Sequence, residues 1–199
     1  MRIVFASGNK GKTKEVAELV RELGLVVVAQ GDLGIDSVEE TGSTFVENAL
    51  LKARHAAAVS GLPAIADDSG LSVAALGGRP GVFSARYAGE DASDEQNISK
   101  LLEEIAALPI AERTAAFHCA AVYVENADAD PLIAEGIWAG VILEERQGSG
   151  GFGYDPVFFD PDAGKSAASM TPAEKNARSH RGKAFHELVR MLSEQAARL

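Results

Sequence analysis

Apolar and polar positions alternate along the chain with periods that predict both helices and strands. Apolar residues spaced three or four apart predict one helix from about Thr13 to Leu23 and a second that begins at Thr44 and ends before Gly61. The spacing Thr44-x-x-Glu47 fits a capping box at the start of the second helix. Three further helices are predicted over about 94–108, from 171 onward and from about 182 to the C-terminus. The acidic segment 91–95 is interpreted as the start of a helix, without a role in a site.

Short apolar runs between these helices predict strands, at about 3–6, 25–29, 63–67, 71–76, 114–125 and 132–143. The first strand, loop, helix and second strand form a unit that favours parallel pairing with a right-handed crossover. The turn-rich link 126–131 predicts a hairpin between the last two strands. This order of elements predicts an α/β fold with a mixed β-sheet flanked by helices.

Composition limits the classes of protein to which the chain can belong. Its 199 residues, 46% hydrophobic and 24% charged, suit a single domain over 1–199, which could comprise two lobes, and no linker is visible. The net charge of −10 argues against nonspecific nucleic-acid binding. No apolar run reaches the roughly 18 residues that a membrane span needs, so we expect a cytoplasmic protein without a membrane partner. The single cysteine, Cys119, lies in an apolar run and is expected to be a buried, inert thiol.

Two adjacent carboxylates are the most informative candidates for chemistry. Asp67 and Asp68 follow an apolar run and precede Ser69-Gly70, which predicts that they lie at the end of a buried strand. Successive strand residues point to opposite sides, so one carboxylate would face a site and the other would brace the loop. The carboxylate in the site could hold Mg²⁺ or deprotonate a water. The alternative is an Asx-type turn that only ends the strand.

A glycine-containing loop between the first strand and the first helix is a candidate phosphate site. It reads Ser7-Gly8-Asn9-Lys10-Gly11-Lys12 and lacks the spacing of a P-loop. Backbone amides at a helix N-terminus favour anions, whereas Lys10 and Lys12 are unfavourable there unless an anion is also present. The alternative is a solvated turn.

The acidic pair Glu39-Glu40 precedes the helix that begins at Thr44. Glu40 is a candidate second carboxylate on the metal side, and the alternative is an exposed acidic loop. Glu47 has its own explanation in the capping box.

Two segments in the C-terminal part of the chain are further candidates for a site. Segment 148–156 has four glycines in six residues and the aromatic residues Phe152 and Tyr154, which suits a flat ligand. The alternative is a tight loop with both rings packed inward. Lys175 and the segment Ser179-His180-Arg181-Gly182-Lys183 gather polar donors near a predicted helix start, and the alternative there is an ordinary basic turn.

The order of these segments resembles the inosine triphosphate pyrophosphatase family, the XTP/dITP pyrophosphatases. The similarity extends from residue 7 to residue 182. The matching segments are Ser7-Gly8-Asn9-x-Gly11-Lys12, Thr41-Gly42-x-Thr44-Phe45-x-Glu47-Asn48-Ala49, Ala66-Asp67-Asp68-Ser69-Gly70-Leu71, Gly78-x-Pro80-Gly81-Val82-Phe83-Ser84-Ala85-Arg86-Tyr87, Gly151-Phe152-Gly153-Tyr154-Asp155-Pro156 and Ser179-His180-Arg181-Gly182.

This resemblance implies an elongated fold with two lobes around a central substrate cleft, a homodimer, and Mg²⁺-dependent hydrolysis of ITP, dITP and XTP to the monophosphate and pyrophosphate. It implies that Asp68 is the general base and a metal ligand, with Glu40 as a second metal ligand. The residues implied to bind substrate are Ser7, Gly8, Asn9, Lys10, Gly11, Lys12, Ser69, Phe152, Gly153, Tyr154, Asp155, Lys175, His180 and Arg181. Two alternatives remain, a pyrophosphatase for modified pyrimidine nucleotides and a nucleotide sensor without turnover.

Overall fold

The computed structural model describes residues 2–21 and 24–197. Within these residues, seven strands form one sheet in the order β2-β1-β3-β4-β5-β6-β7. β1 pairs in parallel with β2 and β3, and β6 pairs antiparallel with β5 and β7, so the sheet is mixed. The strands are β1 (Arg2–Phe5), β2 (Val26–Ala29), β3 (Ala64–Val73), β4 (Thr114–Val124), β5 (Leu132–Ile142), β6 (Phe158–Asp160) and β7 (Lys165–Ser166).

Helices flank this sheet, as the sequence predicts. The α-helices of the described part are α1 (Lys10–Leu19), α2 (Phe45–Ser60), α3 (Asp94–Glu104), α4 (Pro172–Arg178) and α5 (His180–Ala196). Short 3-10 helices connect them at Gln30–Leu33, Ala74–Leu76, Gly81–Arg86, Ile110–Glu112 and Ala167–Ser169. No helix in residues 2–21 and 24–197 combines the length and apolar character that crossing a bilayer requires. The predicted α/β fold with a mixed sheet is confirmed, and the elongated outline and the cleft stay predictions.

The chain divides into two compact units, each assembled from segments that are distant in sequence. The first unit comprises Met1–Asp68, Cys119–Gly136 and His180–Leu199, and the second comprises Ser69–His118 and Ile137–Ser179. Strands β3, β4 and β5 contribute residues to both units. No single stretch of sequence therefore corresponds to a unit, and the assignment of 1–199 to one catalytic domain stays a prediction.

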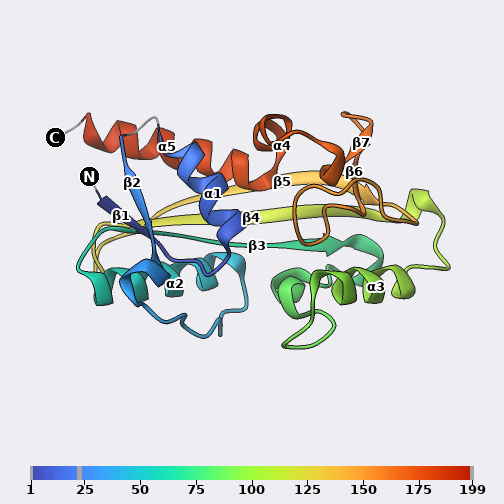
Figure 1. Cartoon of the computed structure of the whole chain (residues 1–199), viewed down its shortest axis with the longest axis horizontal. Helices are drawn as coiled ribbons and strands as arrows, with labels where there is room; N and C mark the ends of the chain where they lie inside the picture. Colours follow the sequence, from blue (N-terminus) through green and yellow to red (C-terminus); the bar gives the residue numbers. More distant parts are fainter. Residues whose placement is uncertain (1, 22–23, 198–199) are drawn as a thin grey trace. The chain divides into compact units, whose positions relative to one another are not determined.

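In the first unit, alternate strand residues pack against different helices. On β1, Ile3 and Phe5 join a core cluster with residues of α1 and α5, whereas Val4, and Ala6 directly after the strand, join a cluster with residues of α2. Figure 1 shows α1 and α5 on one side of these strands and α2 on the other. On β3, Ile65 belongs to the cluster of α1 and α5. The residues that follow Ile65 therefore alternate between the two helical layers.

Helix α2 has the ends that its sequence predicts. The Thr44 side chain accepts a hydrogen bond from the Glu47 amide at 3.1 Å, and the Glu47 carboxylate accepts one from the Thr44 amide at 3.2 Å. Gly61 follows the helix in the left-handed conformation, which glycine adopts without steric cost. Alanines dominate the buried face of α2, and their small side chains let the helix lie close to the sheet. The capping box is confirmed.

The second unit has its own core around three aromatic rings. The centroid of the Phe158 ring lies 4.6 Å from that of Phe117 and 4.9 Å from that of Trp138. Ile98 and Leu101 of α3 pack into the same cluster. Large aromatic side chains bury much apolar area each, so this cluster fixes α3 against the strands of its own unit.

The prediction of two strands at 63–67 and 71–76 is wrong. A single strand, β3, runs from Ala64 to Val73, and residues 74–76 form a 3-10 helix. Gly70 is not among the described glycines with positive φ, so it continues the strand where the sequence suggested a turn. Asp67 and Asp68 therefore lie in the middle of a strand and not at its end.

Several predicted boundaries also differ from the structure. α1 begins at Lys10 and ends at Leu19, while residues 22–23 of the predicted helix lie outside the described residues. α3 ends at Glu104, before the predicted end. α5 begins at His180, so His180 and Arg181 are helical and do not lie between two helices. The strands β6 and β7, of three and two residues, were not predicted because such short runs carry no periodicity.

Helix α5 packs against the backbone of β5 at Gly136. A Cβ atom built on Gly136 would lie 2.1 Å from the His180 carbonyl oxygen and 2.7 Å from the Ala184 amide nitrogen, both backbone atoms of α5. Any side chain at this position would therefore push the first turns of α5 away from the strand.

We expect Gly136→Ala to lower the free energy of unfolding by about 1–3 kcal/mol, the usual cost of overpacking. Chemical denaturation of the variant measures this loss. Gly31→Ala is the matched control, because a Cβ on Gly31 would meet nothing within 4 Å. A Gly136→Ala protein as stable as Gly31→Ala would contradict the close packing.

Candidate functional site

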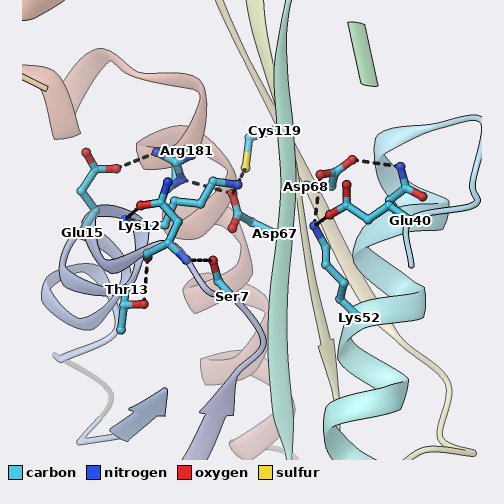
Figure 2. A network of polar contacts seen from close by, with 12 residues as sticks. Ser7, Lys12, Thr13, Glu15, Glu40, Lys52, Asp67, Asp68, Cys119 and Arg181 are labelled. Atoms are coloured by element: carbon cyan, nitrogen blue, oxygen red, sulfur yellow. Dashed lines mark hydrogen bonds and ion pairs between the residues drawn. The ribbon is translucent and has the colours of Figure 1, made fainter. Parts of the chain in front are cut away.

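Asp67 and Asp68 point to opposite sides of β3. Figure 2 shows Asp67 toward Lys12 and Arg181, and Asp68 toward Glu40 and Lys52. This agrees with the alternation of the neighbouring core residues and confirms that the two carboxylates cannot face one ligand together. The first unit thus carries two clusters of charged groups, one on each side of the strand.

The first cluster surrounds the fully buried side chain of Asp67. Its Oδ2 atom lies 3.0 Å from Lys12 Nζ and accepts a hydrogen bond from Arg181 Nε at 3.2 Å. Arg181 also donates from Nη1 to Glu15 Oε2 at 2.6 Å. Burial by itself would raise the pKa of Asp67, but Lys12 and Arg181 hold that pKa well below its usual range. Asp67 is therefore an ionised carboxylate that fixes two cations.

The loop before α1 orders the residues that lead to Lys12. The Ser7 hydroxyl accepts a hydrogen bond from the Asn9 amide at 3.1 Å, and the Asn9 side chain caps α1 by accepting one from the Lys12 amide at 3.1 Å. The sequence predicts an anion that compensates Lys12 at this helix start. The Asp67 carboxylate supplies part of that compensation, because it contacts the Lys12 ammonium. Gly8, Asn9 and Gly11 are exposed, and the Lys10 side chain lies outside the described part. Phosphate binding by this loop stays a prediction.

The second cluster surrounds Asp68 on the α2 side of the strand. Lys52 Nζ contacts Glu40 Oε1 at 2.5 Å and Asp68 Oδ1 at 3.1 Å. Asn48, one turn before Lys52 on α2, donates from Nδ2 to Asp68 Oδ2 at 3.3 Å. Two carboxylates from distant segments thus converge on one ammonium group.

The start of α2 holds the Glu40 segment in place. The Gly42 amide donates to Asn48 Oδ1 at 2.7 Å, so Asn48 joins this segment to Asp68. Glu47 accepts hydrogen bonds from the Ser43 hydroxyl and amide, which lower its pKa. Glu40, and not Glu47, is therefore the glutamate that shares a cation with Asp68.

The carboxylates of Asp68 and Glu40 form an environment that favours a cation between them. Burial raises the pKa of Asp68, Lys52 opposes this rise, and the Glu40 carboxylate adds to it. Burial would lower the pKa of Lys52, but Asp68, Asp67 and Glu40 together raise it. The residues described contain no group of three or more histidine, cysteine or acidic side chains arranged for a metal. Two carboxylates that already share one cation nevertheless fit Mg²⁺, which commonly binds one or two carboxylates and keeps several waters.

The second unit holds another set of the predicted residues in one cluster. Asp155 Oδ2 accepts hydrogen bonds from the Phe152 amide at 2.9 Å and from Lys175 Nζ at 2.6 Å. Lys175 Nζ also lies 4.6 Å from the centroid of the Phe152 ring, a cation–π contact. Gly151 has a φ of +74°, and a Cβ on it would lie 2.0 Å from Asp155 Oδ2, so the turn requires glycine. A buried carboxylate, an ammonium and a half-buried ring therefore meet beside this loop.

Tyr154 has a different environment from that of Phe152. Its side chain is buried, and its hydroxyl donates to the Ser84 carbonyl oxygen at 2.8 Å. Burial raises the pKa of this hydroxyl far above its usual value. Tyr154 thus anchors the loop to the interior of the second unit, and its contact with a nucleoside stays a prediction.

The remaining predicted residues lie in ordered elements. Ser69 is half-buried on β3, directly after Asp68, and His180 and Arg181 are buried in the first turn of α5. Cys119 is buried as expected; burial and then Asp67 raise the pKa of its thiol to about 12. The thiol is therefore protonated at neutral pH and is not a nucleophile.

Sequence reasoning missed three residues that the clusters contain, namely Glu15, Asn48 and Lys52. Asn48 and Lys52 carried a usable signal, because they are polar residues spaced by four in a helix whose neighbouring positions are mostly alanine and leucine. Glu15 carried none, since acidic residues are common at polar positions of helices.

Comparison with known proteins shows the family to which the chain belongs. A model described as the Ham1 family matches residues 3–191, and the chain belongs to that family. Among its relatives, a dITP/XTP pyrophosphatase from Escherichia coli strain K12 is 58% identical over 189 residues, which cover 94% of this chain and 96% of the relative. One of the same name from Pectobacterium atrosepticum is 57% identical, with the same coverage. The structure of a HAM1 protein from Coxiella burnetii, 50% identical, superposes with a TM-score of 0.90 over 98% of this chain and 99% of that chain. The family resemblance drawn from the motifs is confirmed.

Proposed function

We propose that the protein hydrolyses deaminated purine nucleoside triphosphates, namely ITP, dITP and XTP, to the monophosphate and pyrophosphate. Relatives that are 57–58% identical over 94% of the chain carry the name dITP/XTP pyrophosphatase. The observation in the structure that supports this best is the convergence of Glu40 and Asp68 on the ammonium of Lys52. Such a reaction removes nonstandard nucleotides before they enter DNA or RNA.

The reaction needs a base, a cation and a bound polyphosphate. A water oxygen attacks the α-phosphorus, its proton passes to the Asp68 carboxylate, and the bond to the bridging oxygen of the departing pyrophosphate breaks. Negative charge on the phosphoryl oxygens is stabilised by cations close to the reacting phosphorus. The Lys52 ammonium beside Asp68 supplies one of these cations. Mg²⁺ held by Asp68 and Glu40 would supply Lewis-acid stabilisation of the same charge.

The triphosphate is assigned to the loop from Ser7 to Lys12. Its backbone amides precede α1, and a helix N-terminus favours anions. Lys12 adds a cation whose position Asp67 fixes. Asp67 thus serves the site through Lys12 and Arg181 without taking part in the chemistry.

The nucleoside is assigned to two groups of residues. Phe152, Gly153, Tyr154, Asp155 and Lys175 line the nucleoside pocket, and Ser69, His180 and Arg181 complete substrate recognition. Hypoxanthine and xanthine present an acceptor at the six-position of the purine, where adenine presents a donor. Donors from His180 or Arg181 pair with the first two bases and reject the third, because a mispaired hydrogen-bonding site discriminates strongly.

The proposal includes Mg²⁺ as cofactor, a homodimer and a cytoplasmic location. The oxygen ligands of Glu40 and Asp68 support Mg²⁺ on chemical grounds. The dimer and the location are supported by the family resemblance alone.

Incubation of the purified protein with ITP, XTP, dITP, ATP and GTP, with and without Mg²⁺, tests the proposal. We expect Mg²⁺-dependent release of pyrophosphate from the first three substrates, with ATP and GTP nearly untouched. Release of orthophosphate would mean that a different bond is cut. Binding without turnover would favour a nucleotide sensor, and preference for modified pyrimidine nucleotides would favour the other alternative.

A further inference from the structure

The glycine-rich segment 146–153 of the second unit is attached at both ends to the first two turns of α3. At one end, the Gly153 amide donates to Asp94 Oδ2 at 2.7 Å. At the other end, Arg146 Nη2 donates to Ser99 Oγ at 2.9 Å and lies 2.8 Å from Glu95 Oε2. Helix α3 therefore binds both ends of the segment that carries the Phe152 ring, which we assign to base binding.

The carboxylate of Asp94 is not used to cap its own helix. Ser93 is the N-cap of α3, and Gln96 completes the capping box by accepting a hydrogen bond from the Ser93 amide at 2.8 Å. Asp94 is thus available to bind the loop, and an amide hydrogen bond to a carboxylate is stronger than one between neutral groups.

The loop depends on such an attachment because glycine gives its backbone unusual freedom. Gly148, Gly151 and Gly153 all have positive φ angles, and glycine loses more conformational entropy on ordering than other residues. The Phe152 amide donates to Asp155, three residues further along the chain, and the adjacent Gly153 amide donates to Asp94 of α3. The two bonds together fix the peptide unit directly after the Phe152 ring.

We propose that Asp94 is a positioning residue that sets nucleobase affinity and selectivity by fixing the Phe152–Gly153 peptide. Asp94 acts through the Gly153 amide and has no contact with the reacting atoms in this assignment. The kinetic part of this inference rests on the proposed function, since it takes segment 152–155 as part of the nucleoside pocket. The attachment itself is testable without any substrate.

Three variants test the inference. Asp94→Ala removes the acceptor, and Asp94→Asn keeps an oxygen that can accept from Gly153. Asp91→Ala is the control, because it removes an exposed acid three residues before Asp94. We expect Asp94→Ala to raise KM for ITP about tenfold, from the loss of one charged hydrogen bond, with kcat within about twofold of wild type. Asp94→Asn restores most of the affinity, and Asp91→Ala behaves as wild type.

Hydrogen exchange of the backbone amides supplies the readout that needs no activity. Exchange at Gly153 and its neighbours should accelerate in Asp94→Ala and not in Asp91→Ala, with the melting temperatures of the two variants alike. Unchanged exchange in Asp94→Ala would overturn the inference, whatever the substrate. Faster exchange with an unchanged KM would overturn the link to the base, whereas a wild type that does not hydrolyse ITP would refute the proposed function and leave the exchange test in force.

Discussion

Asp68→Asn is expected to lose at least about a hundredfold in kcat for ITP while it still binds the nucleotide. General base catalysis contributes typically 10²- to 10⁴-fold, and an amide cannot accept the proton of the attacking water. The asparagine has nearly the shape of the aspartate, and its carbonyl oxygen can still accept from Lys52. Steady-state turnover at saturating ITP, together with calorimetric titration of the nucleotide, measures the two effects separately.

Asp67→Asn is the matched control on the neighbouring residue of the same strand. Its carboxylate is buried against Lys12 and Arg181, so its neutralisation leaves two cations with less compensation. We expect this variant to lower the melting temperature, whereas Asp68→Asn lowers kcat. Near-normal turnover in Asp68→Asn would refute its assignment as the base.

The sequence was sufficient to predict that adjacent carboxylates face different partners. This follows from the two-residue period of a strand, which does not depend on tertiary structure. The ends of helix α2 were equally predictable from the sequence, because its capping residues and its terminal glycine are local signals. Features determined by neighbours in the sequence were therefore predicted correctly.

The position of Asp67 and Asp68 in the middle of β3 could not be predicted from local sequence in the same way. Ser69 and Gly70 resemble a turn, and only burial of Leu71 and Val73 in the core of the second unit extends the strand beyond them. A strand that contributes to two cores has no signature in its own sequence. Local turn propensity was overridden by tertiary packing.

The contacts of Asp67 illustrate the same limit. Arg181, which binds Asp67, is 114 residues away along the chain, and the sequence marked it only as one of several polar donors near a helix start. The positive charge of Lys12 at a helix start indicates a bound phosphate, whereas the structure supplies a carboxylate of the chain as a partner. Pairing between distant charges requires the fold to be known.

Lys52→Met is expected to reduce kcat/KM for ITP about a hundredfold at saturating Mg²⁺. The ammonium of Lys52 contacts both Glu40 and Asp68, so its replacement removes the positive side chain that these two carboxylates share. Mutual repulsion then raises the pKa of Asp68, so that a smaller fraction of its carboxyl group is ionised and able to accept the proton of water, and the reacting phosphate loses a nearby positive charge. Methionine preserves most of the length and apolar surface of the side chain.

Lys14→Met, on an exposed position of α1, controls for the loss of one positive charge from the protein as a whole. We expect its kcat/KM to remain at the wild-type value, because Lys14 is exposed, where charges are screened, and is not among the residues assigned to the substrate. The thermal melting of both variants shows whether Lys52→Met remains folded. If the folded Lys52→Met protein matched Lys14→Met in kcat/KM, the convergence of Glu40, Lys52 and Asp68 would be structural, and the reaction would have to be assigned to other residues.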